Sequence, residues 1–583
     1  MYDTIIANGR WFDSTGAPSA IRHLGIHDGR IATVSADPLD DPDCPTIVDA
    51  TGKWVIPGMI DIHTHYDVEV LQHPALTESV RHGVTTVLLG SCSLSTIHVG
   101  AADAGDLFGR VEAIPRKHVL AAVGAHKTWR SAHEYVAALE QLPLGPNIAA
   151  FIGHSDIRAA QLGLERATRK DVRLTAGELA GMAAKLTEAL EAGFVGMSSQ
   201  QLMFDKLDGE VCRSRTLPST YATTRERHRL NAILRRCGRV LQGGPDAARP
   251  QSMVTMAASS LGLFRRPLKV SLLAAADIKA IPAVVHVFPL IARVIGALGG
   301  NFRWQHLPVP FEVYADGIDL VVFEEFGSGA EALHLADQVD NRRELLRDEQ
   351  YRRRFRADYD KKFRPRVWHR DFFDAHIVEC PDAAVVGKTF GQVGLDRGGV
   401  HPVDAFLDLV VQHGSKVRWR TTISNHRPDV LDRLAADPGV QVGFSDAGAH
   451  LRNMAFYNFG LRFLRRVRDA ADAGRPFLSV ERAVHRLTGE LADWYGLEAG
   501  HLRVGDRADV VVLDPDRLDD SLDAYAESPI VPFDNLSRMV NRNDETVTAV
   551  FVGGVRVFAD GTPDPVLGTR RTGRFLRATT IGR

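Results

Sequence analysis

Two histidines near the start of the chain are well placed to bind a metal ion. Residues 57–65 read Pro-Gly-Met-Ile-Asp-Ile-His-Thr-His, so an apolar run leads directly into a His-x-His pair. Alternate side chains of a β-strand point to the same side, and His63 and His65 can therefore reach one cation. Imidazole suits zinc and related metals. We predict that this pair binds a metal, the alternative being two ordinary structural histidines.

A carboxylate late in the chain could complete the same site. Asp446 follows the apolar run 442–444 and one serine, again where a strand gives way to polar residues. A carboxylate there can ligate the metal and accept a proton from water whose pKa the metal has lowered. Taken alone, Asp446 could simply cap the next turn or helix. Together with the histidine pair, it is predicted to be the catalytic acid/base.

Short apolar runs followed by helical, charge-rich stretches fill residues 57–495. This alternation predicts an α/β fold with a TIM-type (β/α)8 barrel, whose active sites lie at the carboxyl ends of the strands. Such a barrel would bring His63, His65 and Asp446 to one mouth. The eight candidate strands are 59–62, 85–89, 148–152, 194–197, 239–242, 269–273, 419–423 and 440–444.

Both ends of the chain are rich in strand signals. The Asp28-Gly29 pair marks a hairpin turn near the start, and Gly553-Gly554 marks another near the end. An isolated hairpin is marginal in water, so we predict that residues 1–56 and 496–583 form one small composite β domain. The long segment 274–418 between the sixth and seventh candidate strands is predicted to be an insertion in the barrel.

The composition of the chain limits the classes of binding partner and the cellular compartment that we expect. The formal net charge of −2 argues against a general nucleic-acid binder. The five cysteines form no CxxC motif, and the first residues lack a secretory signal, so a cytoplasmic protein is expected. The most apolar stretch, 280–300, is broken by prolines and charges, which predicts no integral membrane segment. We expect a buried or lid helix there; contact with a membrane surface or an acyl chain stays open.

These motifs together resemble metal-dependent amidohydrolases, specifically the N-acyl-D-amino-acid deacylase (D-aminoacylase) group. In the segment 82–93, Ser91 stands where that group commonly has Asn. The resembling segments are 49–67, 82–93, 153–158, 445–448, 487–492 and 502–512.

The resemblance implies a barrel with an appended β-sandwich formed by both chain ends. It implies Zn²⁺, one or two ions, and hydrolysis of the amide of a small-molecule N-acyl-D-amino acid. Carried over by position, His63, His65 and Cys92 match metal ligands, and Asp446 matches the catalytic acid/base. Zinc readily takes thiolate, although a cysteine such as Cys92 is often only a small buried apolar residue.

The sequence also departs from the group's pattern. Members commonly carry a histidine at the end of the fifth strand and another at the sixth, where this chain has Gln242 and Leu272 or Leu273. A leucine cannot ligate a metal, so the second metal is absent or other residues rebuild its site. The candidate substitutes are His154, His286, His306 and His376.

A substrate carboxylate would favour an arginine partner, because guanidinium pairs with carboxylate at two points. Arg452 and Arg158 are the candidates, with structural ion pairs as the alternative. His450 is a candidate to stabilise the oxyanion or to cap its loop. Two other functions stay open, an amidohydrolase acting on a cyclic or other small amide, and a catalytically impaired barrel that serves as a binding protein. A homo-oligomer is also left open.

Overall fold

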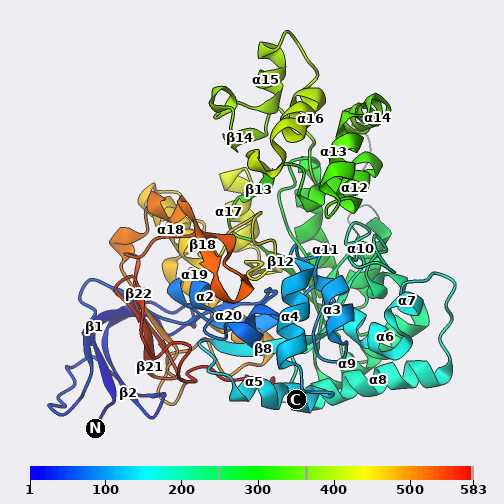
Figure 1. Ribbon diagram of the computed structural model, residues 1–583. Coiled ribbons are helices and arrows are strands. Elements are labelled where there is room, and N and C mark those ends of the chain that lie inside the picture. The colour runs from blue at the N-terminus through cyan, green and yellow to red at the C-terminus, as the bar shows by residue number, and fades with distance from the viewer. Residues whose placement is uncertain (247–249, 362–365, 580–583) are drawn as a thin grey trace.

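A barrel of parallel strands forms the centre of the molecule (Figure 1). The structure is a computed structural model that describes residues 1–246, 250–361 and 366–579. Its eight-stranded sheet has its strands in sequence order around the barrel. They are β6 (Met59–Asp61), β7 (Val84–Leu89), β8 (Asn147–Gly153), β9 (Gly196–Gln200), β10 (Val240–Gly244), β11 (Lys269–Leu272), β12 (Asn301–His306) and β16 (Val440–Val442).

The first and last strands of this sheet close the barrel. The Ile62 amide donates to the Gly443 carbonyl at 2.8 Å, just beyond β6 and β16. The Asp446 amide donates to the His63 carbonyl at 3.1 Å, and the His65 amide to the Ala447 carbonyl at 2.7 Å. The predicted TIM-type barrel is therefore confirmed. The same bonds hold the His-x-His segment beside the segment that carries Asp446.

The seventh strand differs from the prediction. Residues 419–423 lie in β15 (Arg418–Ser424), which is the middle strand of an antiparallel sheet with β13 (Phe311–Asp316) and β14 (His376–Glu379). The seventh barrel strand is instead β12, inside the segment assigned to the insertion. Its sequence, Asn-Phe-Arg-Trp-Gln-His, lacks the continuous apolar run typical of a strand buried on both faces.

Residues 307–361 and 366–427 belong to a long excursion between β12 and α17 (Pro428–Ala436), and its helices stand away from the barrel at the top of Figure 1. Aromatic side chains give the excursion a core of its own; the ring centroids of Phe372 and Phe406 lie 4.8 Å apart, and both rings pack near Trp419. Its α-helices are α12 (Gly327–His334), α13 (Val339–Arg347), α14 (Glu349–Asp360), α15 (Phe390–Asp396) and α16 (Pro402–His413).

Helices of the barrel cover its sheet. Two of them, α8 (Ala176–Glu191) and α9 (Thr224–Cys237), begin with complete capping boxes, in which a threonine side chain and a glutamate three residues later satisfy each other's backbone amides. The larger barrel helices are α3 (Ala101–Phe108), α4 (Arg116–His126), α5 (Ala132–Gln141), α6 (His154–Leu162), α8 (Ala176–Glu191), α9 (Thr224–Cys237), α10 (Pro250–Ala258), α11 (Val287–Ala297), α18 (Phe459–Asp472), α19 (Val480–Leu487) and α20 (Gly489–Tyr495). Among the described residues, no helix is long and apolar enough to cross a bilayer.

The two ends of the chain share one nine-stranded sheet, as predicted. Strand β17 pairs antiparallel with β5, so the halves from either end meet at its centre. The strands are β1 (Thr4–Trp11), β2 (Ala20–His27), β3 (Arg30–Ser35), β4 (Ile47–Asp49), β5 (Trp54–Pro57), β17 (Val510–Leu513), β20 (Val547–Val552), β21 (Val555–Ala559) and β22 (Thr562–Pro563). A separate hairpin comprises β18 (Tyr525–Ile530) and β19 (Leu536–Asn541).

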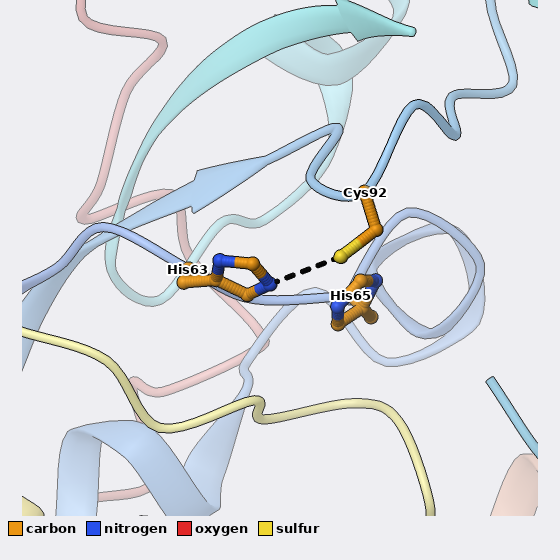
Figure 2. Close-up of side chains that lie close together, drawn as sticks. All are labelled: His63, His65 and Cys92. Atoms are coloured by element: carbon orange, nitrogen blue, oxygen red, sulfur yellow. Dashed lines mark hydrogen bonds between the residues drawn. The ribbon is translucent and has the colours of Figure 1, made fainter. Parts of the chain in front are cut away.

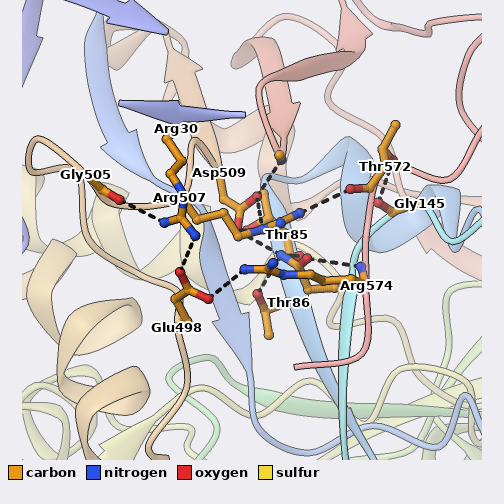
Figure 3. A network of polar contacts seen from close by, with 12 residues as sticks. Arg30, Thr85, Thr86, Gly145, Glu498, Gly505, Arg507, Asp509, Thr572 and Arg574 are labelled. Carbon is orange, nitrogen blue, oxygen red and sulfur yellow. Dashed lines mark hydrogen bonds and ion pairs between the residues drawn. The ribbon is translucent and has the colours of Figure 1, made fainter. Parts of the chain in front are cut away.

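A network of charges fixes this β domain to the barrel (Figure 3). Asp509, 2% exposed, accepts from the side chain of Asn147 at 2.8 Å and from the Gly553 amide at 2.7 Å, and pairs with Arg507 at 3.0 Å. Nearby, Glu498 bridges residues from both ends of the chain, Arg30 and Arg574. The network therefore holds the β domain against strand β8 of the barrel.

Candidate metal centre

Three side chains converge where β6 and β7 end (Figure 2). One ligand atom from each of His63, His65 and Cys92 lies within 4.8 Å of the other two, and the His63 Nε2 to Cys92 Sγ distance is 3.4 Å. The three residues are buried, the histidines to 1% exposure. Zinc in proteins is commonly bound by imidazole and thiolate groups and usually has four ligands. These two imidazoles and this thiol could supply three of the four, so a zinc ion here would need at least one more ligand.

Asp446 supplies a carboxylate to the same cluster. Its Oδ1 lies 3.1 Å from His65 Nε2 and 3.5 Å from His63 Nε2. Both Asp446 and Cys92 have left-handed backbone, with φ of 62° and 52°, a conformation costly for residues other than glycine. The side chain of Asp446 is 13% exposed, compared with 1% for each histidine. The carboxylate is therefore more accessible to solvent than either histidine.

Two glutamine side chains lie behind the ring of His63, and one of them, Gln305, forms a hydrogen bond to it. His63 Nδ1–H donates to Gln305 Oε1 on β12 at 2.7 Å, which leaves Nε2 with its lone pair toward the cluster. Gln242 on β10, at the position where the group commonly has a histidine, places its Nε2 3.3 Å from the same Nδ1. Sequence reasoning missed Gln305 because it did not recognise β12 as a barrel strand.

Glu112, which belongs to no motif recognised in the sequence, lies next to the ring of His65. Glu112 Oε1 lies 3.3 Å from His65 Nδ1, and the Glu112 carbonyl accepts from the His450 amide at 2.6 Å. The His450 ring is close as well, with Nε2 4.0 Å from Glu112 Oε2. The predicted residue His450 therefore lies at the edge of the cluster, and its loop is fixed through Glu112.

The electrostatics of the cluster favour a cation. Burial alone would lower the pKa of His65, but Glu112 and Asp446 raise it to about 9. Burial, with Glu112 and Asp446 nearby, raises the pKa of the Cys92 thiol well above its usual value. A cation that binds here would displace protons from both groups and offset the charge of the buried acids. The other buried acids around the cluster are Asp61, Asp67 and Asp205.

The two predicted substrate-binding arginines are engaged by acids of the chain. Arg158 is wholly buried and pairs with Glu226. Arg452 Nε lies 2.9 Å from Asp316 Oδ2, and a terminal nitrogen of Arg452 lies 2.5 Å from Glu527 Oε2. These are the structural ion pairs expected as the alternative. A substrate role for either arginine stays a prediction.

The four histidines considered for a second metal do not join His63, His65 and Cys92. His154 lies between Ser199 Oγ at 3.0 Å and Glu226 Oε1 at 2.9 Å. His306 Nδ1 donates to the Ala275 carbonyl at 2.7 Å, and His306 follows the inward-facing Gln305 on β12, so it points to the other side of the strand. The remaining two, His286 and His376, are exposed.

Replacing Glu112 by Gln should weaken metal binding by about 10- to 100-fold, because the carboxylate behind a metal-binding histidine orients the ring and raises its basicity. Competition with a chromophoric chelator measures the affinity, and Glu331→Gln, on the exposed surface of α12, is the control. Unchanged affinity in Glu112→Gln would show that Glu112 does not position His65.

The chain is similar to a family model and to several known proteins. Residues 46–242 match the model of the Amidohydrolase family. An uncharacterized protein of Mycobacterium tuberculosis is 56% identical across 100% of this chain and 96% of its own length. A D-aminoacylase of Alcaligenes xylosoxydans is 32% identical over 199 residues, covering 34% of this chain and 37% of that protein.

Among solved structures, the N-acyl-D-glutamate deacylase of Bordetella bronchiseptica, complexed with zinc and a phosphonate inhibitor, superimposes with a TM-score of 0.61. It is 22% identical, and the superposition covers 99% of this chain and 100% of that one. Likeness at this identity shows the fold, a barrel with an additional domain.

Proposed function

The chain belongs to the amidohydrolase superfamily, in its D-aminoacylase-like group, and from that premise we propose that it is a zinc-dependent hydrolase of N-acyl-D-amino acids. The products would be a carboxylic acid and a D-amino acid. The observation that carries the proposal is the convergence of His63, His65, Cys92 and Asp446 at one barrel mouth. The partial similarity to D-aminoacylase supports the choice of substrate class.

The donor set fits zinc, with His63 Nε2, His65 Nε2, Cys92 Sγ and Asp446 Oδ1 as the atoms that would hold it. When bound, such an ion polarises a scissile carbonyl and lowers the pKa of water. Gln305 keeps the His63 ring in the tautomer that presents Nε2, and Glu112 steadies His65. These contacts fix the ligand atoms before substrate arrives.

Asp446 would carry the proton. In the metal-free site, burial would raise the pKa of Asp446, but the hydrogen bond from His65 and the charges of His65 and His63 hold it well below its usual range. A cation bound in place of the His65 Nε2 proton would likewise favour the ionised carboxylate. Asp446 is therefore ionised at neutral pH and can accept the proton of the attacking water. It would then deliver that proton to the nitrogen of the leaving amino acid, so the carboxylate returns to its starting state.

We expect purified protein to contain about one equivalent of divalent metal, since the positions of the second-site histidines hold Gln242 and leucine. Cys92→Ser should lower both metal content and activity, because hydroxyl is a poorer zinc ligand than thiolate. Elemental analysis beside a deacylation assay measures both. Cys44→Ser, a thiol in the N-terminal β domain, is the control. Full metal content in Cys92→Ser would exclude Cys92 as a ligand.

A substrate panel tests the reaction itself. Release of a D-amino acid from N-acetyl and longer N-acyl derivatives supports the proposal. Turnover of a cyclic amide, with no turnover of any N-acyl-D-amino acid, would instead support the alternative amidohydrolase. A metal-free protein that gains no activity with added zinc or cobalt would point to a binding protein.

A further inference from the structure

Exposed apolar side chains are concentrated in one part of the barrel wall. Of the 17 large apolar residues that are exposed within the described chain, seven lie between residues 254 and 298. They are Val254 on α10, Leu263 and Phe264 in the following loop, and four between Val287 and Leu298 on α11 and its carboxyl end. Single exposed apolar residues are ordinary, but a concentration of this kind marks an interaction site.

Helix α11 is apolar on both sides. Phe288, Ala292 and Ile295 are buried against the barrel. On the outer side, Leu290, Val294 and Leu298 follow one another at intervals of four residues and are 55%, 48% and 60% exposed. A surface helix normally presents polar residues to water. No residue that the structure describes covers this outer face.

The loop after α10 extends the apolar surface. Residues 260–268 form a closed loop, since the Leu268 amide donates to the Ser260 carbonyl at 3.1 Å and Ser260 Oγ donates back to the Leu268 carbonyl at 2.8 Å. The base of the loop lies against Gly300, just beyond α11. Figure 1 shows α10 and α11 as neighbours. Leu263 and the fully exposed Phe264 project from this loop.

The segment that carries this surface is rich in positive charge, and the acids nearest to it are Glu490 and Asp493 of α20, which line a shallow pocket together with Arg266. Residues 250–306 contain six Lys and Arg but a single acid, Asp277, which is buried and paired with Arg427. Arg265, Arg266 and Arg293 are exposed, and none forms an ion pair with a residue that the structure describes. Apolar side chains beside unpaired arginines are complementary to a binding partner that has anionic groups on its outside and hydrocarbon beneath them.

We propose that this surface, α10, the 260–268 loop and the outer face of α11, docks the protein on an anionic phospholipid bilayer. Helix α11 has 11 residues, too few to span a bilayer, so it would lie in the interface with Leu290, Val294 and Leu298 toward the acyl chains. Phe264 would insert beside it while Arg265 and Arg266 meet the lipid phosphates. A second copy of the chain is a poorer partner, because a symmetric contact would oppose these arginines to one another.

Flotation of the full chain with vesicles tests the proposal. We expect binding to vesicles of phosphatidylglycerol with phosphatidylcholine, little binding to phosphatidylcholine alone, and weaker binding as salt is raised. The double variant Arg265→Gln/Arg266→Gln should bind about 20- to 30-fold more weakly, at about 5-fold for each charge removed. Phe264→Ser should reduce binding by about 10-fold or more.

Control variants and a measurement of oligomeric state distinguish bilayer binding from dimer formation and from non-specific effects of the substitutions. Leu395→Ser, at a 62% exposed leucine on α15, should bind as wild type does. The proposal is overturned if the anionic vesicles leave the wild type in solution, or if both loop variants bind like it. A concentration-dependent dimer that Phe264→Ser abolishes, with no vesicle binding, would assign the surface to a second copy. Since deacylase activity is not the readout, failure here is distinguishable from failure of the proposed function.

Discussion

Asp446→Asn should lower kcat for amide hydrolysis by about 10²- to 10⁴-fold, the usual contribution of a general acid–base group. The substitution keeps the size of the side chain but removes the carboxylate that would accept and return the proton. The backbone bond from residue 446 to the His63 carbonyl does not depend on the side chain, so the barrel should still close. Steady-state kinetics on an N-acyl-D-amino acid measure the loss.

Metal content distinguishes the two roles of Asp446. If His63, His65 and Cys92 retain the ion, as we expect, a fall in kcat at full metal content assigns the loss to proton transfer. A parallel loss of metal would make Asp446 mainly a ligand. Asp493→Asn, an exposed acid on α20, is the control and should leave kcat unchanged. Wild-type activity in Asp446→Asn would refute the mechanism.

Glu226→Ala should destabilise the protein by about 3–5 kcal/mol, because it leaves the wholly buried Arg158 without its counter-ion. The chain offers a matched control. Glu178 occupies the same position of the capping box at α8 but is partly exposed, so Glu178→Ala should cost about 1 kcal/mol. Urea denaturation of the two variants measures the difference. Equal costs would show that Arg158 does not depend on Glu226.

The same pair predicts a pH dependence. Burial would raise the pKa of Glu226, but His154 and Arg158 outweigh it and lower the pKa from 4.5 to about 2. A folded-state pKa below the unfolded value stabilises the protein above about pH 4.5, and this stabilisation is lost as the pH falls toward 2. Glu226→Gln should lack this part of the acid dependence, which denaturation midpoints across that range would show.

The placement of the candidate ligands was predictable because their signals are local. His63 and His65 stand two residues apart after an apolar run, and period-two alternation alone puts them on one side of a strand. Cys92 and Asp446 likewise end apolar runs, and in a closed parallel barrel such positions meet at one mouth. The strand-rich ends of the chain were recognisable for a similar reason, because turn residues and the alternation of apolar and polar side chains are features of a short stretch of sequence.

What surrounds those ligands depended on contacts between distant residues. Gln305 reaches His63 only because β12 enters the barrel, whereas β15, with the more strand-like sequence, packs in the excursion. Local sequence reports the preference of a segment for extended structure, but which strands pair is decided by burial across the whole chain. Glu112 and Glu226 illustrate the same limit. Whether a glutamate is a solvated surface residue or the buried partner of His65 or Arg158 is set by which side chains the folded chain brings against it, because only burial makes an unpaired charge costly.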